Sequence, residues 1–170
     1  QKHSIGNIVD LVKIFESEFM DLDVTAVRNL ELVKTLKDGK GYGTLLWLLD
    51  KTKTSMGARK LQSMLLSPLK NIKKINDRLD AVDIFYKNAL LRQGVSELLK
   101  SVKDIGRITG KVSNGNLLPK DCLALASSLE VLPSLKFHLA GINSFLINSL
   151  CEEIVDFSDI FNLLSSAIDP

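Results

Sequence analysis

The sequence predicts an all-α fold, an irregular bundle of six to eight helices with at most one short extended or β pair near the N-terminus. Three observations favour this fold class. Apolar residues recur at spacings of three and four, which is the period of an amphipathic helix. Only residues 19–24 show the residue-by-residue alternation of side-chain character that is typical of a β-strand. Four prolines and an aromatic content of 6% disfavour a β-sandwich.

The predicted helices can be placed in order along the chain. Thr44 is a candidate cap for a short helix over 45–49, which is apolar all round and is expected to be buried on several sides. Ser55 is a candidate cap for a second helix that ends near Pro68, because a residue before proline avoids helical geometry. Asn71 precedes a third helix, whose apolar stripe is Ile72, Ile75, Leu79, Val82 and Tyr86.

Prolines organise the second half of the chain. Pro119 suits the first position of a helix, and Pro133 is expected to kink or restart it. Glycine-containing breaks at 38–43, at 113–116 and around Gly141 separate the helical segments. The last predicted helix carries Ile160, Leu163, Leu164 and Ala167.

Length and composition narrow the class of protein. The chain has 170 residues, 45% hydrophobic and 25% charged, which suffices for one domain with a core. Cys122 and Cys151 lack the spacing of a zinc site, so reduced thiols are expected, with a single disulfide left open. The longest uncharged stretch, 137–151, is shorter than the roughly 20 residues of a membrane helix, so no membrane partner is expected.

Charge is unevenly distributed although the net charge is only +2. Residues 34–78 hold 11 basic and 3 acidic side chains, whereas residues 141–170 hold 5 acidic and no basic ones. The basic segment could face DNA phosphates or an acidic neighbouring domain, or could simply be solvated helix faces.

No catalytic constellation is visible. The Gly39–Thr44 stretch lacks the GxxxxGK spacing that cradles phosphates. His3 and His138 have no nucleophile or carboxylate partner in sequence, and the acids at 152–159 carry no metal-ligand motif. We therefore expect no enzyme activity, cofactor or metal in this chain, and a scaffold, lever or binding module instead.

Several stretches, in order, resemble one known family. The first is FMDLDVTAVRNLEL at residues 19–32, similar to the "LD…T.RNLEL" opening of the core (lever) domain in the MutS family of DNA mismatch-repair proteins. The second is TLLWLLDKTKTSMGARKL at 44–61, similar to "SLL..LD.T.T.MG.R.L". Weaker similarities lie at 67–82, 110–121 and 129–135. Two departures are Gly106, where the family pattern "D[LI]ER" has an acid, and Met64, where it often has Trp.

This resemblance implies a part of a larger protein, which the absence of an initiator Met at Gln1 also suggests. Residues 1–18 would be the tail of a connector domain, and 19–170 the first half of the core/lever domain, without the clamp, ATPase and mismatch-reading domains. The expected function is a non-catalytic lever that links the DNA clamp to the ATPase and transmits conformational change. ATP, Mg²⁺, mismatched double-stranded DNA, a homodimer and a bacterial cytoplasmic location near the nucleoid would all belong to the parent protein.

Alternatives to the lever stay open at this point. One is a freestanding helical protein-interaction module, and another is direct DNA binding through residues 34–78. The sequence does not separate the repair branch of the family from its close paralogues.

The resemblance also selects residues. Arg28, Asn29 and Glu31 are expected to fix a short turn, unless they are simply exposed polar residues. Arg59 is expected to bridge to Asp50 or to another domain, or else to be a free surface arginine. The complete set of structural or inter-domain candidates is Arg28, Asn29, Glu31, Asp50, Met56, Gly57 and Arg59. Met56 and Gly57 are expected to allow close helix packing. The weaker DNA-facing candidates are Lys51, Lys53 and Lys60.

Overall fold

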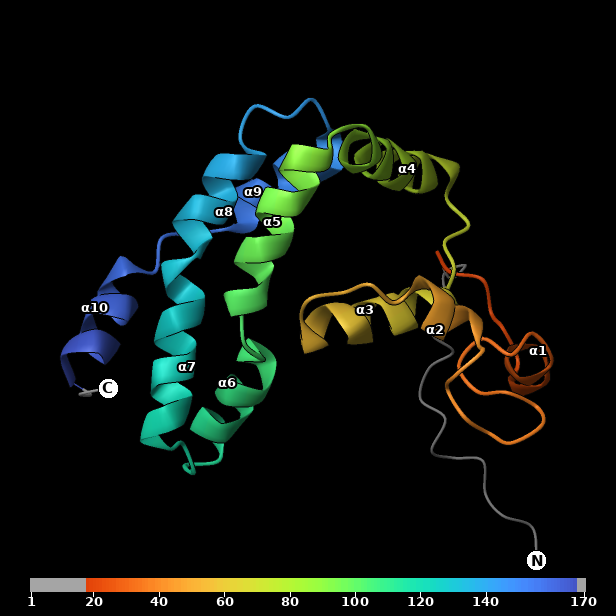
Figure 1. The fold of residues 1–170 in the computed structure, drawn as a ribbon, viewed down its shortest axis with the longest axis horizontal. Helices are drawn as coiled ribbons and strands as arrows, with labels where there is room; N and C mark the ends of the chain where they lie inside the picture. Colours follow the sequence, from red (N-terminus) through yellow and green to blue (C-terminus); the bar gives the residue numbers. More distant parts are fainter. Residues whose placement is uncertain (1–17, 168–170) are drawn as a thin grey trace, which may run out of the picture.

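The computed structural model describes residues 18–167 and confirms the all-α prediction, because that range contains helices and no strand (Figure 1). The helices are α1 (Val24–Asn29), α2 (Leu45–Leu49), α3 (Ser55–Leu66), α4 (Ile72–Lys87), α5 (Ala89–Ser101), α6 (Ile105–Ser113), α7 (Pro119–Glu130), α8 (Leu132–Leu139), α9 (Phe145–Glu153) and α10 (Ser158–Ala167). Eight of them have eight residues or more, whereas α1 and α2 are shorter. The expected connector tail, 1–18, lies outside the described residues except for Glu18, as does His3.

The helices form an arch (Figure 1). The helix α4 lies at the upper right of the arch, next to the upper ends of α5 and α9, while α1 and α2 lie at one foot and α5 to α10 form the opposite leg. Within that leg α7 packs against α6, α8 and α10, and α9 packs against α4 and α8. The helix α3 packs mainly against α2, and its N-terminal end points across the arch toward α6.

The buried side chains fall into two separate groups. The larger group lies in and beside α4 to α9 and comprises Ala81, Val95, Ile108, Ala126, Leu129 and Ile147, together with the polar residues Asp121, Ser128 and Ser144. The smaller group lies at the foot, where Leu32 and Thr44 are buried. The helix α3 between them contains no buried residue. The two groups are therefore not joined into one continuous core through α3.

Capping side chains set the helix starts. The Thr44 hydroxyl accepts from Trp47 N at 3.2 Å and donates to Gly41 O at 2.7 Å, as the predicted cap of α2. Asn71 Oδ1 accepts from Lys74 N at 3.1 Å at the start of α4, also as predicted. The prediction for Ser55 is wrong by one residue, because Thr54 caps α3 by accepting from Gly57 N at 3.0 Å. Thr54 has the extended backbone that a cap requires.

Prolines act in the second half as expected. Pro119 is the first residue of α7, and α8 restarts at Leu132, next to Pro133.

The junction of α6 and α7 is held by an ion pair, in which Lys111 Nζ donates to Asp121 Oδ1 at 2.7 Å. Asp121 also accepts from Leu118 N at 3.2 Å. The hydrogen bond from Lys111 is the main reason that the pKa of Asp121 lies below its ordinary value.

The predicted burial of α2 is wrong. Leu45, Trp47, Leu48 and Leu49 are between 39% and 61% exposed. The Tyr42 ring covers part of Trp47 at a centroid distance of 4.5 Å, and Tyr42 is itself exposed. An apolar helix is buried only if other elements surround it, and among the described residues α3 is the one helix that packs substantially on α2.

The strand-like alternation of 19–24 yields a single antiparallel bridge, between Phe19 and Leu69. Met20 N donates to Pro68 O at 2.7 Å, and Lys70 N donates to Glu18 O at 2.9 Å. Lys74 Nζ lies 2.6 Å from Glu18 Oε2, so the first described residues are attached at the start of α4. The extended pair expected near the N-terminus is therefore limited to this bridge.

Ile147 is expected to be the most sensitive residue of α9, because it is only 4% exposed. Ile147→Ala should lower the free energy of unfolding by about 2–5 kcal/mol through lost burial and a residual cavity. Urea denaturation followed by circular dichroism measures this. The control is Leu150→Ala on the same helix, where half of the side chain is exposed and a much smaller effect is expected. Equal effects of the two variants would contradict the assignment of the core.

Candidate functional site

An ion pair joins the tip of α3 to the start of α6. Arg59 Nη1 donates to Asp104 Oδ2 at 2.7 Å, and Arg59 Nη2 donates to Asp104 Oδ1 at 2.8 Å. The partners are 45 residues apart in sequence. Two parallel bonds from a guanidinium to a carboxylate fix orientation as well as distance. The Arg59 side chain is 49% exposed and that of Asp104 15% exposed, so the contact lies at the surface with its carboxylate sheltered.

Asp104 serves α6 as well. It is the N-cap of that helix, and its Oδ1 accepts from Arg107 N at 3.2 Å. Arg107 Nε lies 3.3 Å from Asp104 Oδ2. The hydrogen bonds from Arg59 are the main reason that the pKa of Asp104 lies well below its usual range, since they stabilise the ionised carboxylate. The same contact raises the pKa of Arg59.

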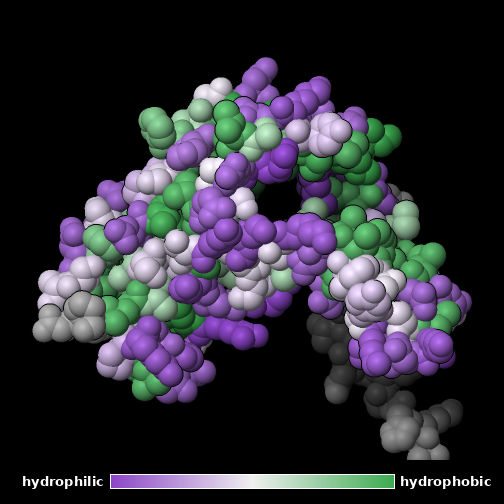
Figure 2. All heavy atoms as spheres, in the orientation of Figure 1, coloured by the Kyte–Doolittle hydropathy of each residue, from purple (hydrophilic) through white to green (hydrophobic). Residues whose placement is uncertain are grey.

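This ion pair occupies a special place in the arch. Within residues 18–167, no other hydrogen bond or ion pair joins α3 to the leg formed by α5 to α10. Figure 2 shows an opening in the arch, with hydrophilic atoms along its inner side. The contact between Arg59 and Asp104 closes the arch between the foot and the leg.

The structure places the first predicted group around the turn after α1. Glu31 has a positive φ of 47°, and its Oε1 accepts from Leu36 N at 2.5 Å. Glu31 O accepts from Leu45 N at 3.3 Å, which ties the turn to α2. Arg28 and Asn29 lie exposed at the end of α1, and neither side chain makes a hydrogen bond or ion pair to the described residues. Of the three, Glu31 is the one whose side chain holds the turn.

The structure gives separate roles to the remaining structural candidates, Asp50, Met56, Gly57 and Arg59. Arg59 pairs with Asp104 and not with Asp50, whose Oδ1 instead accepts from Thr52 N at 3.0 Å and from Thr52 Oγ1 at 2.7 Å. Gly57 does permit a close approach, but a Cβ there would lie 3.0 Å from Thr54 Oγ1 rather than against another helix. Met56 is half-buried next to it in α3.

The three lysines proposed to face DNA are exposed. Lys51 and Lys53 lie between α2 and α3, and Lys60 lies on α3. None of them forms an ion pair with the part of the chain that the structure describes. Their charges are thus available to an external anion.

The Gly39–Thr44 loop is tied into the local structure. Thr35 N donates to Lys40 O at 2.9 Å, so the loop is closed by its own backbone. The Thr44 hydroxyl is used within the loop and at the cap of α2. The helix that follows has only five residues, which gives little helix dipole for an anion.

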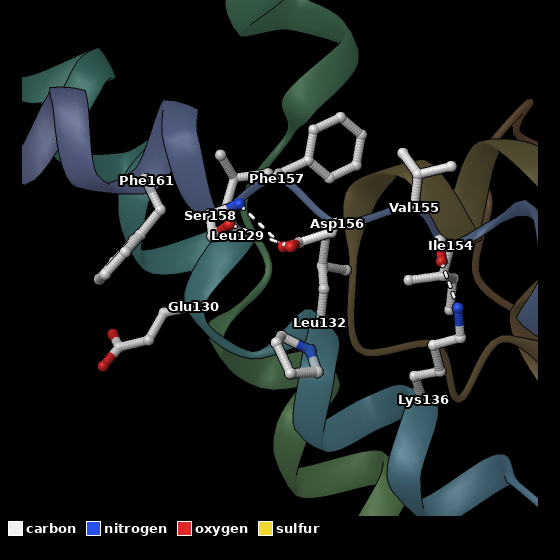
Figure 3. A pocket seen from close by; sticks show the side chains of 11 residues that line it. Leu129, Glu130, Leu132, Lys136, Ile154, Val155, Asp156, Phe157, Ser158 and Phe161 are labelled. Carbon is white, nitrogen blue, oxygen red and sulfur yellow. Dashed lines mark hydrogen bonds between the residues drawn. The ribbon is translucent and has the colours of Figure 1, made fainter.

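A second feature is an apolar groove of about 450 Å³ between the junction of α7 and α8 and the segment that leads into α10 (Figure 3). Leu129, Leu132, Phe157 and Phe161 are among its lining residues. Lys136 Nζ donates to Ile154 O at 2.8 Å. Asp156 Oδ1 accepts from Ser158 N at 2.9 Å. Lys136 and Asp156 are thus engaged in local structure, and the apolar lining of the groove suits packing better than chemistry.

No group of three or more potential metal ligands occurs in residues 18–167. No helix in the same range is both long and apolar enough to span a membrane.

Asp104 is a site residue that the sequence analysis did not predict. The sequence signal for Asp104 is that of a helix N-cap, because an aspartate directly precedes the amphipathic segment that forms α6.

Gly106 offers a test of the space beside this ion pair. A Cβ at this position would lie 3.7 Å from Asp104 Oδ1 and 4.0 Å from Arg59 Nη2, without a clash. Gly106→Ala should raise the free energy of unfolding by about 0.5–1 kcal/mol, because alanine favours the helix. Gly106→Glu should stabilise more than Gly106→Gln, because its carboxylate faces Arg59 and the N-terminus of α6. Urea denaturation compares the three. Equal stability of the Glu and Gln variants would show that Asp104 already satisfies Arg59.

The Asp104 carboxylate should make stability depend on pH in the acid range. Its pKa is lowered in the folded chain, so its stabilising effect is complete above the unfolded value of about 3.9 and is lost as the pH falls toward the folded value. Asp104→Asn keeps a capping oxygen but cannot titrate. Melting temperatures measured from pH 7 to pH 2 should therefore fall more steeply below about pH 4 for the parent chain than for the variant. Parallel curves would contradict this assignment.

Comparison with known proteins gives a consistent result. The family described as MutS domain III matches residues 25–170. The chain is 38% identical over 168 residues to the DNA mismatch repair protein MutS of Lachnoclostridium phytofermentans and 39% identical over 168 residues to that of Clostridium perfringens. It is 38% identical over 169 residues to that of Bacillus cytotoxicus. These alignments cover 99% of this chain but only 18% of each relative. The resemblance read from the motifs is thereby confirmed, and the chain belongs to the MutS domain III family.

Proposed function

We propose that this chain is a non-catalytic helical lever that transmits conformational change between a DNA clamp and an ATPase during mismatch recognition. The single observation that carries the proposal is the arch closed by Arg59 and Asp104. It joins two separately packed groups of helices at one defined point. Membership of the MutS domain III family supports the mismatch-repair context.

The packing suits a lever. Closely packed helices move together as rigid units, and changes between discrete arrangements carry coupling between distant sites. The helices α4 to α9 enclose the larger buried group, so they can move as one unit. The foot around Leu32 and Thr44 is a second, smaller unit. Force applied to one unit would reach the other through α3 and through the chain that links α3 to α4.

The exposed apolar faces suit contacts with other domains of the same protein. Trp47 and Leu48 are exposed on α2. On α10, Ile160 is 44% exposed and Leu163 66% exposed. Soluble monomers rarely expose contiguous apolar patches of more than a few hundred Å². Under this proposal the clamp and the ATPase, together with ATP, Mg²⁺, mismatched DNA and a homodimer in the bacterial cytoplasm near the nucleoid, belong to the parent protein.

The exposed lysines favour a second, lesser role, a direct contact with DNA backbone. Lys51, Lys53 and Lys60 could approach phosphates without first breaking an ion pair to the described residues. Such contacts are sequence-independent and depend steeply on salt. They would strengthen the grip of the parent protein without reading the mismatch.

The chain alone should bind duplex DNA weakly, with a dissociation constant of about 10⁻⁴–10⁻⁶ M, and should not distinguish a mismatched from a matched duplex. Fluorescence anisotropy at several salt concentrations measures both properties. Replacing Lys51, Lys53 and Lys60 by Gln should flatten the salt dependence. The control replaces by Gln two other exposed lysines, Lys103 and Lys120, which likewise form no ion pair with the described residues. Nanomolar, mismatch-specific binding, or hydrolysis of ATP by the chain, would contradict a purely transmitting role.

A chimera tests the lever itself. The matching segment of the Clostridium perfringens MutS relative is replaced by this chain, and the hybrid is expressed in a bacterium that lacks its own MutS. We expect the spontaneous mutation rate to fall toward that of the repair-proficient strain, whereas a hybrid with the segment deleted should not lower it. A folded hybrid that hydrolyses ATP and binds DNA but leaves the mutation rate unchanged would contradict transmission by this segment.

A further inference from the structure

We propose that the ion pair between Arg59 and Asp104 is a releasable latch, and that residues 67–71 are the hinge about which the latched arm swings. The arm is defined as residues 18–66, which include α1 to α3, and the body as residues 72–167, which include α4 to α10. The inference rests on the proposed function only in one respect, namely what the motion of the arm is used for. The latch itself follows from how the arm and the body are attached.

The arm touches the body through polar contacts at two places. One is at the hinge, where Lys74 Nζ lies 2.6 Å from Glu18 Oε2. The other is at the far end of α3, where Arg59 meets Asp104. The substantial helix pairs of the described chain join α2 to α3 or join helices of the body to one another. Apart from the latch, no extensive helix packing holds the tip of α3 in place.

The hinge has the properties of a flexible joint between two rigid elements. Ser67 ends α3 with φ −134° and ψ 73°, outside helical geometry. Asn71 caps α4 independently, through its bond from Lys74 N. None of the residues 67–71 between these caps is buried. A change of backbone angles in this segment would therefore unfold neither helix and open no core, although it would bend or break the backbone hydrogen bonds from Met20 N to Pro68 O and from Lys70 N to Glu18 O.

The latch can open without disrupting α6. Asp104 would keep its capping bond from Arg107 N when Arg59 departs. Arg107 Nε, already 3.3 Å from Asp104 Oδ2, would remain beside the carboxylate. Arg59 is half exposed, so water would solvate its guanidinium at once. Salt screens ion pairs at the surface, and the guanidinium is the exposed partner here, which makes this pair suitable for repeated release.

The test measures the distance from the arm to the body. Spin labels are attached to cysteines introduced at the exposed positions Lys53 and Lys120, with Cys122 and Cys151 replaced by Ser. Pulsed electron paramagnetic resonance should give one narrow distance distribution for this labelled parent. Arg59→Gln should broaden the distribution and shift it to longer distance. Asp104→Asn should do the same while it retains the cap of α6.

Arg107→Gln is the matched control, because it removes a cation from the same carboxylate without touching the link to α3. It should leave the distribution narrow. Salt at about 1 M should broaden the parent distribution, since the Debye length is then about 3 Å. Circular dichroism of each variant shows whether the helices persist. If Arg59→Gln proves unfolded, the distance distribution of Asp104→Asn decides whether the ion pair holds the arm in place.

Two results would overturn the latch. One is an unchanged narrow distribution in folded Arg59→Gln and Asp104→Asn. The other is equal broadening by Arg107→Gln, which would indicate a general effect of charge. Neither result depends on repair activity, so a failed chimera and a failed latch can be told apart.

Discussion

The contact that closes the arch depends on one carboxylate. Asp104 begins α6 by accepting from its first turn, and the same side chain receives the fork of Arg59 from α3. A single residue thus sets both the start of a helix in the long leg and the point at which the foot reaches that leg. The surrounding helices pack well within each part but offer no comparable contact between the parts, as far as residues 18–167 show.

The distribution of burial explains why this chain suits a role inside a larger protein. The long leg contains most of the buried apolar residues, whereas α2 and the outer face of α10 leave large apolar side chains exposed. Phe157 and Phe161 also line the apolar groove between the junction of α7 and α8 and the segment that leads into α10 (Figure 3). Burial of such surface is the main driving force for association of domains. The chain spans 18% of the length of its relatives, and exposed apolar faces agree with a part that others cover.

The departure from the family pattern at Gly106 has a structural meaning. A Cβ at Gly106 would lie 4.0 Å from Arg59 Nη2, so an acidic side chain at this position could reach the guanidinium. In this chain Asp104 is the one carboxylate that binds Arg59 among the described residues. A single ion pair at this point is compatible with the proposed latch.

Local signals in the sequence determined most of the helices. The three- and four-residue spacing, the caps at Thr44 and Asn71 and the prolines at 119 and 133 act within a few residues, so the sequence alone placed them. The cap of α3 was misplaced by one residue because Thr54 and Ser55 both offer a hydroxyl. Tertiary structure alone decided the exposure of α2, since burial depends on which elements surround a helix. It also decided the partner of Arg59. Asp50 and Asp104 are both carboxylates that a guanidinium can bind, and only the course of the chain over 45 residues brings the second within 2.7 Å.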